Sequence, residues 1–311
     1  MSVKDLTQQL GTAIQALSDC DTMRGMFHEH RDGAPLPSGP ALREIIDLCR
    51  AILFPGFYGN SNLNSQTLEY HIGVNVERLY RLLSEQVTAG LCFSREQHEN
   101  EGADKADAAG SEAVCPVDRA QEIALAFITK LPELRSVLAT DVEATYTGDP
   151  AAASRGEIIS CYPVVKAITN YRIAHELYLQ GVPLVPRIIT EMAHSETGID
   201  IHPEAQIGHH FSIDHGTGVV IGATCIIGNH VKLYQGVTLG AKSFPLDENG
   251  HPIKGIPRHP ILEDDVIVYS NATILGRITI ARGTVIGGNL WVTESTQPGE
   301  RLVQAKRTSF N

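Results

Sequence analysis

Histidine, carboxylate and arginine side chains gather at two places in the second half of the chain. The first is Asp214-His215, with Asp200 upstream of it, and the second is Arg258-His259, which is flanked by prolines. A carboxylate that accepts from one imidazole nitrogen fixes the tautomer and leaves the other nitrogen as a base. Arginine followed by histidine is a plausible clamp for a carboxylate ligand. These residue types predict acid–base chemistry beside a carboxylate clamp, although capping and corner-filling roles for Asp200 and His215, and a solvated loop charge at Arg258-His259, stay open.

The elements that must position these residues follow a period of six. Leu262 to Val292 has an aliphatic residue at every sixth position, and the same period runs from Ile201 to Ile213 and from Ile221 to Leu239. This period fits neither an amphipathic helix nor a flat strand. It is typical of a hexapeptide β-helix, a triangular prism in which the aliphatic residues point inward and stack on one another.

This series of stacked aliphatic residues, the ladder, is interrupted twice, and the two interruptions contain His215 and Arg258-His259. The step from Ile213 to Ile221 is eight residues and contains His215, whereas the step from Leu239 to Leu262 is twenty-three and ends beyond Arg258-His259. Insertions at the corners of a solenoid often build its binding face. Positions about 15 to 20 apart stack vertically in such a prism, so we expect Asp200 and His215 to approach each other.

The first half of the chain is predicted to be helical. Apolar periodicity and start signals predict helices over 41–54, 67–83, 118–130, 132 to about 148, and 163–179, the last one before the prism. The polar, acidic stretch 95–112 is expected to be a mobile loop. The predicted class is α+β, with a helical domain (1–148), a helical connector that contributes to the active site (149–199), a left-handed β-helix (200–294, with loop 241–261) and a short tail (295–311).

Composition excludes several classes of protein. A net charge of -11 argues against a nucleic-acid partner. The six cysteines form no CxxC pair, so reduced thiols are expected rather than disulfides or a zinc site. No apolar run is long enough to span a membrane and the N-terminus lacks the pattern of a secretion signal, so we expect a cytoplasmic protein with no membrane partner.

A metal site is the competing interpretation of the histidines. His210 and His215 are five residues apart, and His209 is adjacent. Some β-helix enzymes bind a metal through histidines on the prism wall that neighbouring subunits supply. This alternative needs a third ligand, for which His230 or His259 would have to serve.

The order of the motifs resembles one family. Asp200-Ile-His-Pro, Ile213-Asp-His-Gly-Thr-Gly, Gln235-Gly-Val-Thr-Leu-Gly and Arg258-His-Pro, together with Asp149-Pro-Ala and Tyr171-Arg-Ile-Ala-His upstream, are similar to serine O-acetyltransferase, the bacterial and plant enzyme of cysteine biosynthesis. The resemblance covers roughly residues 149 to 294. It implies a left-handed parallel β-helix that transfers acetyl from acetyl-CoA to the hydroxyl of L-serine, giving O-acetylserine.

The resemblance also implies roles for individual residues. His215 would be the general base, held by Asp200. Asp149 and Asp214 would contact the amine and hydroxyl end of the amino acid, and Arg258 and His259 would hold its carboxylate. Acetyl-CoA, the co-substrate, would lie along the wall near the residues Gly240, Ala241, Ser270 and Gly288, and no metal is implied.

Assembly and partners are further expectations. The resemblance implies a homotrimer with active sites between neighbouring prisms, and leaves the pairing of two trimers open. The chain departs from the family in Gly240-Ala241-Lys242, in a longer loop before Arg258, and in a tail ending Phe310-Asn311. We therefore expect no stable complex with O-acetylserine sulfhydrylase. The alternative functions are an acyltransferase for a sugar or antibiotic hydroxyl and a metal-dependent β-helix hydratase.

Overall fold

The structure is a computed structural model that describes residues 3–23, 26–28, 35–59, 62–100 and 116–304. The chain divides into two units, Met1–Pro35 and Leu36–Asn311. The first unit contains helix α1 (Val3–Leu17), none of whose residues is buried, and a short 3-10 helix, η1 (Cys20–Thr22). Sequence analysis did not anticipate α1. The expected tail ends at Phe310 and Asn311, which lie outside the described residues.

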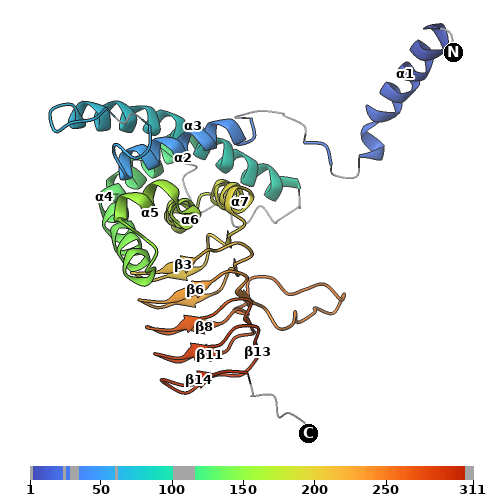
Figure 1. The fold of residues 1–311 in the computed structure, drawn as a ribbon. Helices are drawn as coiled ribbons and strands as arrows, with labels where there is room; N and C mark the ends of the chain where they lie inside the picture. The colour runs from blue at the N-terminus through green and yellow to red at the C-terminus, as the bar shows by residue number, and fades with distance from the viewer. Residues whose placement is uncertain (1–2, 24–25, 29–34, 60–61, 101–115, 305–311) are drawn as a thin grey trace. The chain divides into compact units, whose positions relative to one another are not determined.

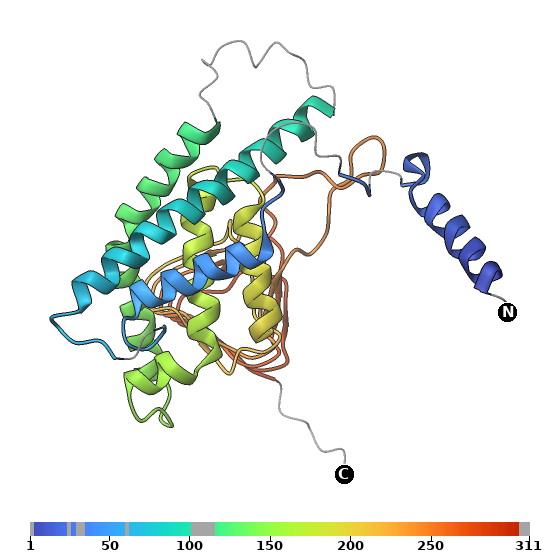
Figure 2. The ribbon, with the colours of Figure 1, turned by 90° about the horizontal axis from the view of Figure 1, so that it is seen from above.

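The second unit begins with a layer of helices that lies above the prism (Figures 1 and 2). These helices are α2 (Gly39–Leu53), α3 (Leu68–Asn100), α4 (Pro116–Gly148), α5 (Arg155–Cys161), α6 (Pro163–Leu179) and α7 (Val185–Thr197). Ser38 caps α2 by accepting from the Ala41 N–H, and Pro40 occupies the first turn, where no N–H is needed. Figure 2 shows α3 and α4 running side by side across the helical layer.

Three helical predictions were wrong in detail. The expected break at Pro132 is absent, because α4 runs unbroken through it. Proline inside a helix costs about 3 kcal/mol, and the buried Phe127, Leu131 and Leu138 on either side offset that cost by packing into the core. The helix over 163–179 is not the last, since α7 follows it. Residues 95–100 of the expected acidic loop belong to α3, and 101–112 lie outside the described residues.

The prism consists of parallel strands on three faces, as a left-handed β-helix requires. The first face has β1 (Asp200–Ile201), β4 (Val220–Ile221), β7 (Thr238–Gly240), β10 (Thr273–Leu275) and β13 (Trp291–Val292). The second face has β2 (Gln206–Ile207), β5 (Ile226–Ile227), β8 (Ile261–Leu262) and β11 (Thr279–Ile280). The third face has β3 (Ser212–Asp214), β6 (Lys232–Tyr234), β9 (Ile267–Val268), β12 (Val285–Ile286) and β14 (Arg301–Leu302).

The period of six is confirmed as the core of this prism. Every ladder residue from Ile201 to Val292 is buried except Ile207, which is partly buried. A second inward row, which sequence analysis missed, lies two positions before the ladder and includes Phe211, Val231 and Ala272. β14 adds a strand within the stretch expected to be tail, so the solenoid extends to Leu302.

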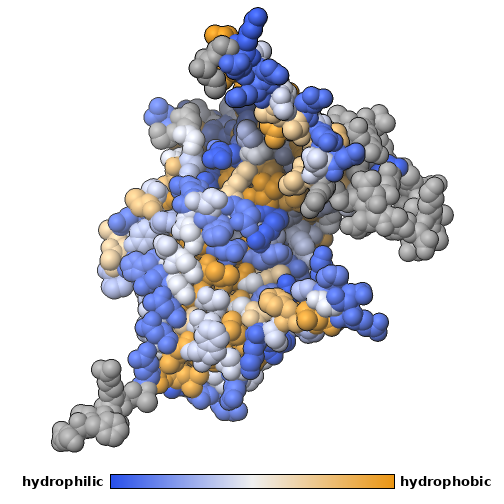
Figure 3. Space-filling model, turned by 90° about the vertical axis from the view of Figure 1, so that its right-hand side faces the viewer, coloured by the Kyte–Doolittle hydropathy of each residue, from blue (hydrophilic) through white to orange (hydrophobic). Residues whose placement is uncertain are grey.

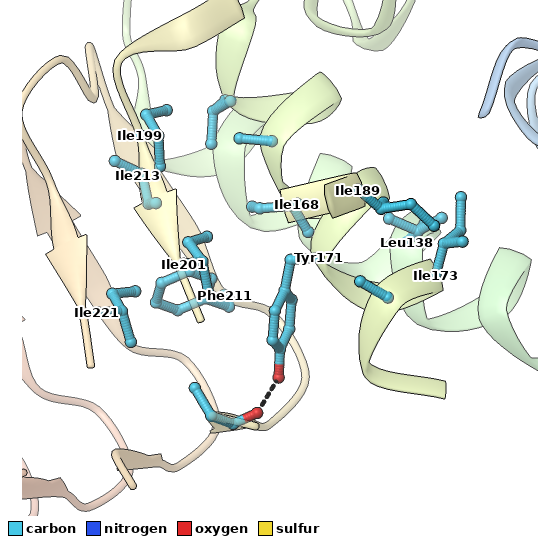
Figure 4. Packing of buried hydrophobic residues seen from close by; sticks show 14 of the residues in the cluster. Leu138, Ile168, Tyr171, Ile173, Ile189, Ile199, Ile201, Phe211, Ile213 and Ile221 are labelled. Carbon is cyan, nitrogen blue, oxygen red and sulfur yellow. Dashed lines mark hydrogen bonds between the residues drawn. The ribbon is translucent and has the colours of Figure 1, made fainter. Parts of the chain in front are cut away.

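Helices and prism share one hydrophobic core rather than folding as separate domains. Figure 4 shows Tyr171 of α6 reaching from the helical layer to the prism, where its hydroxyl donates to the Ala205 carbonyl (2.6 Å). Next to it, the buried Arg172 guanidinium forms an ion pair with Asp141 of α4. Arg172 also donates to the carbonyls of Ile207 and Gly208. These contacts fix the helical layer on the first coil, where several of the candidate residues lie.

The loop expected between Leu239 and Leu262 is confirmed. It leaves the prism after β7 and returns at β8 (Figure 1). Its residues 242–255 are exposed, including the large hydrophobic side chains of Phe244, Leu246 and Ile253. Among the helices described, none has the length and apolar composition needed to cross a bilayer.

Candidate active site

The turn from the third face to the first carries the candidate base. His215 and Gly216 both have positive φ (59° and 96°), which lets the chain leave β3 sharply. A Cβ at Gly216 would lie 2.5 Å from Ile199 Cδ1, so only glycine fits there. As a result the His215 side chain projects outward and is 75% exposed, with its Nε2 3.8 Å from Asp214 Oδ1.

Four other side chains lie near His215 at this turn. We call the five residues together the carboxylate corner: Asp149, Tyr162, Asp214, His215 and Lys232. Tyr162 donates its phenolic hydrogen to Asp149 Oδ2 (2.6 Å). Lys232 Nζ lies 3.3 Å from Asp214 Oδ2. Asp149 comes from the end of α4 and Tyr162 from the start of α6, so helical and prism residues form this corner together.

Electrostatics keep Asp149 ionised. The hydrogen bond from Tyr162 lowers the pKa of Asp149, and the Ala151 N–H and the charges of Lys232 and His215 act in the same direction. The same hydrogen bond, together with burial, raises the pKa of Tyr162 to about 12. The corner therefore presents carboxylates to a cation, with an exposed imidazole beside them.

Asp200 lies in a separate group at the start of the first face. Its Oδ1 is 4.0 Å from Arg187 Nη1, and Arg187 also pairs with Glu191, one turn later on α7. His194 Nδ1 lies 3.1 Å from Glu191 Oε2. Although both residues are described, the structure contains no hydrogen bond or ion pair between Asp200 and His215. Their pairing stays a prediction.

The Arg258-His259 pair lies at the next corner, where the first face turns into the second. Thr224 holds it there, because the Thr224 hydroxyl accepts from the N–H groups of Arg258 (2.9 Å) and His259 (3.1 Å). Arg277 supports the same segment by donating to the carbonyls of Thr224 and His259. Together with His202, whose pKa is lowered to about 4 by burial and by the charges of Arg187 and Arg258, these residues form the arginine corner.

The ring of His259 is buried and locked. Its Nδ1 accepts from the Thr224 N–H (3.0 Å), so in the neutral ring the hydrogen must be on Nε2. Burial, with the charges of Arg258 and Arg277, lowers the pKa of His259 to about 4, so the ring is neutral near pH 7. A Cβ at Gly222 would lie 2.1 Å from His259 Cδ2, so the ring occupies space that only glycine leaves free.

The guanidinium of Arg258 retains bonding capacity. Its Nε is buried and has no hydrogen-bond partner among the described residues. A buried donor left without a partner is costly unless a ligand or water supplies an acceptor. With His259 Nε2, this corner presents a positive charge and two kinds of N–H donor to an anion.

The two corners are on opposite edges of the first face. The His215 turn precedes β4 on that face, and the Thr224 turn that holds Arg258 and His259 follows β4. The residues predicted to bind the coenzyme are divided in the same way. Gly240 ends β7 and Ala241 follows it, whereas Ser270 and Gly288 lie in stacked turns before β10 and β13, where Asn289 N donates to the Ser270 carbonyl. All four are partly buried, which leaves their backbone partly accessible.

The histidines of the competing metal site lie apart from one another within one chain. His210 stacks on His230, with ring centroids 4.3 Å apart, while His215 is at the carboxylate corner and His259 at the arginine corner. In the described part of the chain, the one group of ligand atoms close enough to share an ion is Glu191, His194 and Asp200, and Arg187 already pairs with two of these. The histidines that motivated the metal interpretation are thus not gathered within one chain.

Comparison with known proteins decides the family. No family model matches the chain. A serine acetyltransferase of Synechococcus elongatus is 48% identical over 303 residues, which cover 97% of this chain and 92% of that protein. The chain belongs to the serine acetyltransferase family. A serine acetyltransferase of Bacillus licheniformis is 46% identical over 151 residues, 49% of this chain and 66% of that protein.

Solved serine acetyltransferases share the fold. Serine acetyltransferase 1 of Entamoeba histolytica, crystallised with L-cysteine, has a TM-score of 0.70 at 34% identity, covering 93% of this chain and 94% of that one. The soybean serine acetyltransferase complexed with serine has a TM-score of 0.52 at 26% identity, covering 88% and 98%. The predicted family, fold class and reaction are confirmed: serine acetyltransferases are acyltransferases that acetylate serine, with acetyl-CoA as the co-substrate.

Several residues around the two corners received no role in sequence analysis. They are Tyr162, Arg187, His202, Thr224, Lys232 and Arg277. For Lys232 the spacing could have served as a signal. The coil from β3 to β6 is twenty residues long, so Ser212 pairs with Lys232 and Asp214 with Tyr234, which places Lys232 next to Asp214. The others depend on which helix packs on which coil, and the spacing of residues does not reveal that.

Proposed function

We propose that this chain acetylates L-serine by direct transfer from acetyl-CoA, with His215 as the general base. The proposal rests above all on the exposed imidazole of His215 beside the carboxylate corner. A serine hydroxyl is a poor nucleophile until a base removes its proton. His215 would take that proton as the serine oxygen attacks the acetyl carbonyl, and the imidazolium would return a proton to the departing thiolate. Asp200 would orient the imidazole.

The two corners suit the two ends of a zwitterion. Asp149 and Asp214 would face the ammonium and hydroxyl end of serine, since both belong to the carboxylate corner. Arg258 and the Nε2–H of His259 would hold its carboxylate. The coenzyme would lie along the wall at Gly240, Ala241, Ser270 and Gly288. An acceptor sugar carries no charged ends, so it would leave both corners without a partner.

Removing the guanidinium of Arg258 tests the carboxylate clamp. Arg258→Ala should weaken serine binding by about 1.5–3 kcal/mol, because a charged hydrogen bond to the substrate is lost. Acetyl-CoA binding should stay nearly unchanged. Steady-state KM for serine and a binding titration with acetyl-CoA measure the two effects, and Arg282→Ala, an exposed arginine of the same prism, is the control. Loss of acetyl-CoA affinity with normal serine KM would show that Arg258 serves the coenzyme.

We further propose that the active site is shared between neighbouring copies in a homotrimer. The support is the position of the two corners on opposite edges of the first face, because a face of six extended residues is about 20 Å wide, more than one serine molecule can bridge. Exposed hydrophobic side chains also lie on that face and its loop, including Trp291, which is 71% exposed, and Phe244. Figure 3 shows hydrophobic groups scattered among hydrophilic ones on one side of the molecule. Contact between copies would cover such groups.

Subunit mixing tests the shared site. At serine concentrations far below the KM of the Arg258→Ala protein, His215→Ala and Arg258→Ala proteins that are dissociated and reassembled together in equal amounts should regain about one quarter of wild-type activity, the share of sites in random trimers that receive both intact residues. Each protein reassembled alone is the control. No recovery in mixtures that light scattering shows to be trimers would place the whole site within one chain.

A further inference from the structure

Lys232 is the one cation of the carboxylate corner, and neither the predicted catalytic roles nor the predicted binding roles include it. It lies on β6, one coil beyond Asp214, and its side chain is 17% exposed. Its ammonium donates to the Gly148 carbonyl (2.7 Å), next in sequence to Asp149. It also lies 3.3 Å from Asp214 Oδ2 and 4.7 Å from the centre of the Tyr234 ring.

The charge of Lys232 is secure. Burial alone would lower the pKa of this amine, but the hydrogen bond with Tyr234 and the charge and hydrogen bond of Asp214 outweigh it and raise the pKa. Lys232 also helps to lower the pKa of Asp149. One fixed positive charge therefore acts on both carboxylates that would receive the substrate's ammonium.

Little room remains for a second ammonium. The cavity lined by Thr145, Asp149, Tyr162, Ser212, Ile213, Asp214 and Lys232 has a volume of about 10 Å³. A single water needs roughly 10–15 Å³ on this measure. The lysine ammonium thus lies beside Asp214 in a cavity that both carboxylates line, and a substrate amine that enters it must displace the lysine or bind against its charge.

We propose that Lys232 is a tethered competitor of the substrate ammonium: it neutralises Asp149 and Asp214 when no serine is bound and weakens the binding of acceptors that carry an amine. This rests on the proposed function, since it takes Asp149 and Asp214 as the amine-binding groups. Two neighbouring carboxylates without a counter-ion repel each other, so the lysine keeps the empty corner stable. The same charge reduces the attraction that an incoming ammonium feels.

Lys232→Met keeps the length of the side chain and removes its charge. We expect the KM for serine to fall by about tenfold, the effect of about 1.4 kcal/mol, with kcat changed much less. Lys232→Arg, which retains the charge, should behave like the wild type. An unchanged or raised KM for serine in Lys232→Met would overturn the proposal, because a lysine that merely supports Gly148 or the substrate gives that result.

An analogue without the amine separates charge from space. 3-Hydroxypropionate is serine with hydrogen in place of the ammonium, and it can be measured as an acceptor or as an inhibitor competing with serine. Lys232→Met should not improve its binding, whereas an equal gain for both compounds would show that only room was created and would contradict the proposal. Lys232→Ser repeats the test if the methionine variant does not fold, as judged by its circular dichroism.

The outcome is distinguishable from failure of the proposed function. Wild-type protein that does not acetylate serine refutes the function itself, whatever Lys232 does. Active wild-type protein with no gain in Lys232→Met refutes only the competition.

Discussion

Replacing His215 with alanine should lower kcat for acetyl transfer to serine by about 10²–10⁴-fold, the usual contribution of a general base. Thiol release from acetyl-CoA at saturating substrates measures this loss. Because the side chain is 75% exposed and packs on little, the folded structure and its unfolding midpoint should be nearly unchanged. His251→Ala, an equally exposed histidine on the loop, should retain full activity.

The size of the loss discriminates between roles. A kcat within tenfold of the wild type would remove His215 from the proton transfer. Asp200→Asn should cost less than His215→Ala, because it disturbs the orientation of the base without deleting it. In the structure Asp200 lies near Arg187, so a normal kcat for Asp200→Asn would mean that Asp200 serves the helix contact alone.

Replacing Arg172 with methionine should destabilise the second unit by about 3–5 kcal/mol, because it leaves the Asp141 carboxylate buried without its partner. Arg172 donates to both carboxylate oxygens of Asp141 (2.7 and 3.0 Å) and to two prism carbonyls, and the Phe211 N–H donates to the same carboxylate. The two side chains are 8% and 4% exposed, so water cannot replace these bonds easily.

Urea unfolding at fixed protein concentration measures this change. Arg119→Met breaks an exposed ion pair with Glu122 and should cost less than about 1 kcal/mol. Adding Asp141→Leu to Arg172→Met should recover part of the loss, since the isolated charge is then gone. A loss below 1 kcal/mol in Arg172→Met would mean that apolar packing alone joins the helices to the prism.

The prism could be predicted because its signal is repeated. Each coil places an aliphatic residue at the same phase, so single irregularities such as the partly buried Ile207 do not hide the pattern. The helices carry weaker signals. Pro132 predicted a break, yet a long buried stripe on α4 overrides the local preference of one residue. Helix α7 follows Pro183 and begins with Pro186 in its first turn, whereas sequence analysis placed the last helix of the connector at 163–179.

The sequence predicted which candidate residues lie at corners of the prism, but not which side chains contact them. The eight-residue step marked His215 and the long insertion marked Arg258-His259, and the structure has both at corners of the prism. The side chains that hold the candidate residues in place come from other parts of the chain. Tyr162 donates to Asp149 from another helix, and Thr224 accepts from the N–H of Arg258, thirty-four residues later. Such pairs arise from packing, which residue spacing in one sequence does not encode.

The prism ends differently at its two extremities. Helices cover the first coil, where α4 packs on β3 and α7 on β1. At the other extremity, β11, β13 and β14 are outermost on their faces, and along one side of each strand no strand partner is present among the described residues. Backbone donors and acceptors there form a ready template for another coil. Because the carboxylate corner, the arginine corner and the buried ion pair are all near the covered extremity, coils can be added at the open one without moving these three groups. In such a molecule the prism can lengthen while both corners stay the same.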